Sequence, residues 1–191
     1  MRLVKAAEVR TIDPRVTFAE LQQWPDDGLR YELYDGEVIV VPLPFPRHQR
    51  VAMNVGEILR EYERRVGGTA FAVAIDIVFT DHNALQPDAV YFSEARRQLI
   101  EDWKVTRAAP DLAVEILSRS TEVRDRGRKM QMYERFGVPE CWIVDPARNT
   151  LEVYVLRGAD YELAIAAGAN DDVTSPTLSN LSFSTSRISA E

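Results

Sequence analysis

The run Asp111–Ser118 constrains the fold of this chain more than any other segment. It reads Asp-Leu-Ala-Val-Glu-Ile-Leu-Ser, and the stretch between its polar ends is apolar except at Glu115. An almost continuous apolar run of this length is typical of a central strand that is covered on both faces. The sequence therefore predicts a sheet with helices packed on it, with Glu115 in a strand that is otherwise apolar.

The segments around this run alternate between strand and helix patterns, which indicates one mixed sheet with helices packed on it. An Asp-Gly pair at 35–36 lies between two β-prone runs and predicts a hairpin, while Thr17 and Glu20 form a capping box that opens a short helix. In chain order we expect strands at 30–34 and 37–41, a long helix from His48 to Val66, strands at 71–79 and 85–92, a short helix around 93–100, the strand at 111–118, a helix capped by Ser120 or Thr121, a strand at 140–144, and a hairpin of 151–156 with 161–165.

Length and composition point to one globular domain spanning residues 1–191. A chain of 191 residues can bury one sizeable core, and 46% hydrophobic with 28% charged residues is a globular balance. No apolar run reaches the length of a membrane span, and the charged N-terminus lacks a signal core, so we expect a cytoplasmic protein without a membrane partner. The single Cys141 excludes an internal disulfide and a cysteine-cluster zinc site.

Two carboxylates stand out as candidate metal ligands. Glu115 in its apolar run needs a metal ion, a basic side chain or backbone N–H groups to compensate its charge. Asp88 follows a proline at the start of a predicted strand, which by itself is a common turn signal. Together, an Asp and a Glu from neighbouring strands can bind a hard divalent cation such as Mg²⁺ or Mn²⁺. The pair Asp88 and Glu115 is therefore the predicted metal site.

Several motifs then follow one another in an order that resembles a known family. They are Tyr31-Glu32-Leu33-x-Asp35-Gly36-Glu37, His48 at a helix start, Pro87-Asp88, Val114-Glu115-Ile116-Leu117-Ser118, Asp125 with Lys129, and the run from Tyr133 through Gly137-Val138-Pro139-Glu140 to Trp142-Ile143-Val144-Asp145-Pro146. Over about residues 17–165 the chain resembles the Uma2 family, formerly a domain of unknown function. The resemblance implies an α/β restriction-endonuclease-like core of the PD-(D/E)xK superfamily, a central mixed β-sheet flanked by helices, with an N-terminal helix and a β-hairpin.

The resemblance also implies catalytic roles for further residues. In the superfamily a lysine two positions after the Glu orients or activates the attacking water, but Leu117 stands at that position here. The corresponding residue in Uma2 proteins comes from the next helix, which transfers the role to Lys129. Its alternative is a solvent-facing salt bridge with Asp125 four residues earlier. Glu37 is expected to add a ligand or a base, the alternative being an ordinary hairpin residue.

The sequence also raises the question of what role three more residues have. His48 falls on the apolar stripe of its helix, where a lone histidine is more often a core residue, although the resemblance places it near the metal or a phosphate. Asp76 interrupts a predicted strand and is expected to be structural. Arg119 replaces the proline usual after the Glu-x-Leu motif, and it either helps to bind phosphate or tethers a carboxylate.

The predicted function is Mg²⁺-dependent endonucleolytic hydrolysis of nucleic acid, with DNA as the first expectation and a homodimer as a further one. The net charge of −7 argues against strong sequence-independent binding to nucleic acid, but leaves a local site open. The alternative is a non-catalytic module with the same fold that binds nucleic acid or protein, or that dimerises. The choice between DNA and RNA, and between single and double strands, has no sequence signal.

Overall fold

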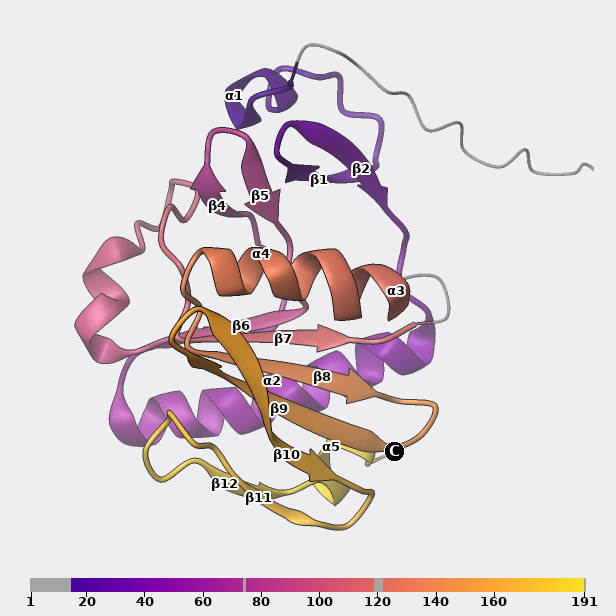
Figure 1. The fold of residues 1–191 in the computed structure, drawn as a ribbon, viewed down its shortest axis with the longest axis vertical. Coiled ribbons are helices and arrows are strands. Elements are labelled where there is room, and N and C mark those ends of the chain that lie inside the picture. The colour runs from indigo at the N-terminus through magenta and orange to yellow at the C-terminus, as the bar shows by residue number, and fades with distance from the viewer. Residues whose placement is uncertain (1–14, 74, 119–121, 191) are drawn as a thin grey trace, which may run out of the picture.

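In the computed structural model, which describes residues 15–73, 75–118 and 122–190, a six-stranded mixed sheet forms the centre of the molecule (Figure 1). Its strand order is β10-β9-β8-β7-β6-β3; β7 and β8 run parallel and the other neighbours are antiparallel. The strands are β3 (Thr69–Phe71), β6 (Ala89–Phe92), β7 (Leu112–Ile116), β8 (Glu140–Asp145), β9 (Thr150–Arg157) and β10 (Asp160–Ala167).

Strand β7 is buried on both faces, as the apolar run predicts. Leu112, Val114 and Ile116 belong to the core cluster beneath the long helix α2 (Pro46–Val66). Ala113 belongs to the opposite cluster, which includes Tyr133 of helix α4 (Met130–Arg135). Figure 1 shows α4 in front of the sheet and α2 behind it. Glu115 therefore points to the α4 side of a sheet that both helices shield from water.

A second sheet of four antiparallel strands lies beside the first among the described residues, in the order β2-β1-β5-β4. Its strands are β1 (Arg30–Tyr34), β2 (Glu37–Val41), β4 (Ile77–Thr80) and β5 (Asn83–Leu85). The predicted hairpin of β1 and β2 is confirmed, with Asp35 and Gly36 both at positive φ as a tight two-residue turn requires.

The remaining elements are short. They are α1 (Phe18–Leu21), the 3₁₀ helix η1 (Glu94–Leu99), α3 (Glu122–Arg124), the π-helical turn η2 (Asp125–Lys129), β11 (Asp172–Thr174), β12 (Ser182–Ser184) and α5 (Ser186–Ser189). The capping box of Thr17 and Glu20 is formed at α1. The predicted cap at Ser120 or Thr121 lies outside the described residues. No described helix combines the length and apolar character needed to cross a membrane.

Two predicted strands are wrong in their extent. The run 71–79 is divided into β3, which pairs in the central sheet, and β4, which pairs in the second sheet. Val73, which the alternation assigns to the core face, is 68% exposed in the connection between them. The run 85–92 is interrupted at Gln86–Asp88, because Pro87 has no backbone N–H to donate to a neighbouring strand.

The C-terminal hairpin, which has no sequence assignment, is anchored by a buried carboxylate. Glu140 of β8 accepts hydrogen bonds from the hydroxyl groups of Ser175 and Thr177 and from the indole of Trp142. Its side chain is fully buried. These contacts fix the segment that leads from β11 to β12 against the central sheet.

Candidate active site

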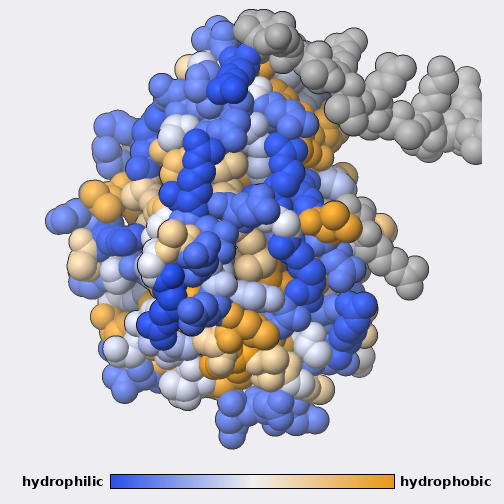
Figure 2. All heavy atoms as spheres, viewed as in Figure 1, coloured by the Kyte–Doolittle hydropathy of each residue, from blue (hydrophilic) through white to orange (hydrophobic). Residues whose placement is uncertain are grey.

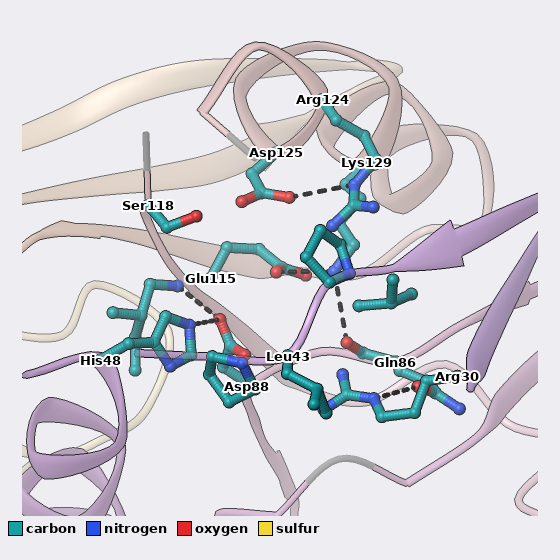
Figure 3. A pocket seen from close by; sticks show the side chains of 14 residues that line it. Arg30, Leu43, His48, Gln86, Asp88, Glu115, Ser118, Arg124, Asp125 and Lys129 are labelled. Carbon is teal, nitrogen blue, oxygen red and sulfur yellow. Dashed lines mark hydrogen bonds and ion pairs between the residues drawn. The ribbon is translucent and has the colours of Figure 1, made fainter. Parts of the chain in front are cut away.

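A small cavity lies where β1, β7, the Gln86–Asp88 connection and the helical turn η2 meet (Figure 3). Its volume is about 30 Å³, and a single water needs roughly 10–15 Å³. The lining carboxylates within the described chain are Asp88, Glu115 and Asp125, and the lining basic side chains are Arg30, Arg124 and Lys129. The cavity wall is therefore rich in charge of both signs.

Glu115 enters the cavity from β7 and is almost completely buried. Its Oε2 lies 2.8 Å from Lys129 Nζ, and its Oε1 accepts a hydrogen bond from the Tyr133 hydroxyl. Burial raises the pKa of Glu115 well above its usual range, against the opposing charge of Lys129. Lys129 and Tyr133 therefore meet the predicted need for a compensating group only in part.

Asp88 is fixed to β7 by hydrogen bonds on both sides of Glu115. Its backbone N–H donates to Val114 O at 3.0 Å, and its Oδ2 accepts from the backbone N–H of Ile116 at 2.7 Å. These bonds bring the two predicted ligands to one cavity. Burial raises the pKa of Asp88, but the hydrogen bond and charge of His48 with further contacts outweigh this and leave it below its usual value.

Lys129 extends from the π-helical turn into the cavity and is buried. Its Nζ lies 2.8 Å from Glu115 Oε2, 3.1 Å from Glu32 Oε1 and 3.2 Å from Gln86 O. The alternative of a solvent-facing salt bridge is thus wrong. Burial lowers the pKa of Lys129, but the charges of Glu115 and Glu32 outweigh that effect and hold it well above its usual value.

His48 stands in the first turn of α2 with its Nε2 3.2 Å from Asp88 Oδ2 (Figure 3). Its side chain is 13% exposed and lines the cavity. Nδ1 is buried without a hydrogen-bond partner among the described residues. The structure therefore brings His48 to the candidate site, as one of its two interpretations expects.

Glu37 does not reach the cavity, whereas Glu32 of the same hairpin pairs with Lys129, which lines it. Glu37 pairs with Arg128 at 2.8 Å, and its side chain is 48% exposed. The two glutamates lie on the same face of the hairpin, because Tyr34 pairs with Glu37 and Ile39 with Glu32. Glu37 is two residues closer to the turn than Glu32, and its side chain contacts Arg128 instead of lining the cavity.

Glu32 is the acidic residue that sequence reasoning missed. It is fully buried, and its Oε1 accepts from the Gln86 N–H at 2.9 Å while its Oε2 accepts from the Tyr34 hydroxyl at 2.9 Å. A carboxylate between Tyr31 and Leu33 in a β-prone run is the available signal, of the same kind as that of Glu115.

Asp76 and Arg124 contact residues of this same group. Asp76 accepts a hydrogen bond from Gln86 Nε2 at 2.8 Å, which agrees with a structural role, and burial raises its pKa. Arg124 lines the cavity and lies 3.9 Å from Glu32. Arg119 lies outside the described residues.

Asp88 and Glu115 offer two carboxylates to a metal ion, a number that suits an ion that keeps several waters. Within the described ranges, no three His, Cys, Asp or Glu side chains form a group that could hold a metal ion. Mg²⁺ usually binds through one or two carboxylates and keeps several waters. Asp88 and Glu115 on one cavity with room for water match that pattern.

Comparison with known proteins agrees with the fold and the motifs. The model of the Uma2 family, described as "Putative restriction endonuclease", matches residues 18–186. The chain belongs to the Uma2 family. A search of curated proteins finds no match.

A solved structure of similar fold comes from Anabaena variabilis, described as "a putative nuclease belonging to DUF820". The TM-score is 0.75 at 22% sequence identity, covering 92% of this Uma2 chain and 98% of the other. The predicted mixed α/β fold with a restriction-endonuclease-like core is thereby confirmed.

Proposed function

We propose that this Uma2 protein hydrolyses phosphodiester bonds in nucleic acid, with DNA as the first substrate to test. The observation that carries the proposal is the attachment of Asp88 to β7 on both sides of Glu115, which brings two carboxylates and Lys129 to one cavity. The family description and the description of the similar structure support it. In the reaction, the oxygen of a water forms a bond to phosphorus, one P–O ester bond breaks, and the leaving oxygen takes up a proton.

Asp88 and Glu115 are the residues that would hold Mg²⁺ or Mn²⁺. Such an ion supplies a bound water of lowered pKa and polarises the phosphate. The hydrogen bond from Ile116 N–H and the contact with His48 keep the Asp88 carboxylate ionised and oriented toward the cavity. His48 acts in this proposal by positioning Asp88.

Lys129 acts as a fixed positive charge in this proposal rather than as a base. A general base works best when its pKa lies near the pH of the reaction, whereas two carboxylates hold the pKa of Lys129 well above its usual value. Its ammonium group donates to Glu115 and to the Gln86 carbonyl and lies 3.1 Å from Glu32 Oε1. Held this way, Lys129 would orient the attacking water and stabilise negative charge that develops on the phosphate.

One observation favours a second candidate, a non-catalytic module with the same fold. Both carboxylate oxygens of Glu115 have protein partners, Lys129 at Oε2 and Tyr133 at Oε1. An ion at Glu115 would compete with Lys129 for the carboxylate. In the second candidate this ion pair is permanent, and the protein binds nucleic acid or another protein without cleaving it.

Cleavage of labelled oligonucleotides separates the two candidates. Single- and double-stranded DNA and RNA are incubated with Mg²⁺, Mn²⁺ or EDTA, using wild type, Asp88→Asn, Glu115→Gln and Lys129→Gln. We expect divalent-ion-dependent cleavage that Asp88→Asn and Glu115→Gln abolish, and that Lys129→Gln lowers by about 10²-fold or more. The matched control is Glu152→Gln, because Glu152 forms an ion pair with Arg126 at 2.6 Å and neither residue lines the cavity. Cleavage that survives Asp88→Asn would refute the site, and binding without cleavage would favour the second candidate.

A further inference from the structure

The connection between β2 and α2 forms an apolar rim beside the charged cavity. Val41, Pro42, Leu43 and Pro44 line the cavity, and Phe45 follows them directly. Leu43 is 76% exposed and Phe45 is 67% exposed. Figure 2 shows a hydrophobic patch where Figure 1 places this connection. We define the rim as residues 42–45.

Folding alone gives no reason for these side chains to face water. Exposed apolar residues that are scattered over a surface are ordinary, but Leu43 and Phe45 stand two residues apart at the edge of one cavity. Exposed apolar surface next to a concave site often marks a binding surface. Leu43 lines the same cavity as Asp88 and Glu115, so the rim is continuous with the candidate active site (Figure 3).

The rim has the chemistry of a nucleobase contact rather than of a phosphate contact. Prolines at 42 and 44, with Pro46 after the rim, fix the backbone φ angle and remove three N–H donors. The segment therefore holds its shape and offers apolar surface with few groups that could donate to phosphate oxygens. Leucine, phenylalanine and proline are also side chains that nucleic-acid-binding proteins insert between bases, disrupting their stacking.

We propose that the rim binds a nucleobase next to the phosphate that enters the cavity, so that the substrate is a single-stranded or locally unpaired nucleic acid. The proposal rests on the proposed function, because the cavity supplies the phosphate site. In a nucleotide the charged phosphate and the flat apolar base are close neighbours, and cavity and rim present matching surfaces side by side. A base inside an intact duplex is stacked on both faces and cannot lie against Leu43 and Phe45.

The test compares two ligands that differ only in their bases. Fluorescence anisotropy measures the binding of a labelled oligodeoxythymidylate and of an abasic oligomer of equal length. Ca²⁺, which also prefers oxygen ligands, replaces Mg²⁺ in the buffer. The variants are Leu43→Ser with Phe45→Ser, each single substitution, and Leu163→Ser as a matched control on β10, where Leu163 is 52% exposed. Phe45 is the N-cap residue of α2, and serine is favoured there, so the fold is not at risk.

We expect wild type to bind the base-bearing oligomer about tenfold more tightly than the abasic one. The double substitution should remove this preference without weakening the abasic oligomer, each single substitution should remove part of it, and Leu163→Ser should keep it. Equal binding of both oligomers by wild type, or a preference that survives the double substitution, would overturn the rim proposal and leave the proposed function standing. No binding of either oligomer would overturn the rim proposal, while cleavage of duplex DNA or RNA would still decide the proposed function.

Discussion

Replacing Lys129 with methionine tests the charge network on which the candidate site depends. Methionine keeps most of the stem and removes the ammonium group, which lies 2.8 Å from Glu115 and 3.1 Å from Glu32. Both carboxylates are buried. Removing one partner of a buried ion pair costs about 3–5 kcal/mol, and Glu115 can recover part of this by taking up a proton. We expect a loss of about 3 kcal/mol in the free energy of unfolding at neutral pH, measured by urea denaturation.

The pH dependence of that loss has a definite sign. Burial raises the pKa of Glu115 in the folded state, and the charge of Lys129 opposes the rise. Without Lys129 the folded state therefore binds a proton over a wider range above the unfolded pKa of about 4.3. Stability falls with rising pH wherever the folded state binds more protons. The variant should lose less stability relative to wild type at pH 5 than at pH 8.

Arg128 provides the control, since it is the neighbouring basic residue and pairs with the exposed Glu37. Arg128→Met should cost about 1 kcal/mol or less, as exposed pairs usually do. The reasoning would be refuted if Lys129→Met cost no more than Arg128→Met, or if its cost were the same at pH 5 and pH 8.

Three further predictions concern single positions. Glu37→Gln should leave nuclease activity unchanged while Glu32→Gln lowers it, as a cleavage assay on both variants measures. Gly68→Ala should cost about 2–3 kcal/mol in urea denaturation, because an added Cβ would lie 2.4 Å from Phe92 O at a φ of +84°. Asp145→Asn should cost about 1 kcal/mol at pH 7, since Asp145 accepts from the N–H groups of two following residues. Burial raises the pKa of Asp145, but its hydrogen bonds and Arg148 outweigh burial, so the pKa in the folded state is lowered. The stability lost in Asp145→Asn should therefore shrink as the pH falls below the unfolded-state pKa of about 3.9, and vanish below the folded-state pKa.

Local patterns predicted the elements that depend on neighbouring residues. The Asp35-Gly36 turn, the long helix α2 and the covered strand β7 follow from turn chemistry and periodicity, and all three are confirmed. The division of 71–79 could not be predicted this way, because alternation shows that a segment is extended and not which sheet it joins. The C-terminal hairpin depends on contacts with Glu140, a residue distant in sequence.

The candidate site shows the same limit at the level of side chains. A carboxylate in an apolar run marks Glu115, and neighbouring strands explain why Asp88 is close to it. The partner of Glu115 could not be chosen from spacing, since Lys129 reaches it through a π-helical turn. Glu37 and Glu32 share a face of one hairpin, and only the packing of the hairpin against η2 decides which of them meets Lys129.

Calorimetric titration of Mg²⁺ and Mn²⁺ tests the central claim most directly, namely that Asp88 and Glu115 form a metal site. We predict that wild type binds the ions and that Asp88→Asn and Glu115→Gln lose this binding. Both variants should still show a cooperative melting transition, which establishes that they are folded. Wild type without measurable ion binding, or a Glu115→Gln variant with unchanged affinity, would contradict the claim.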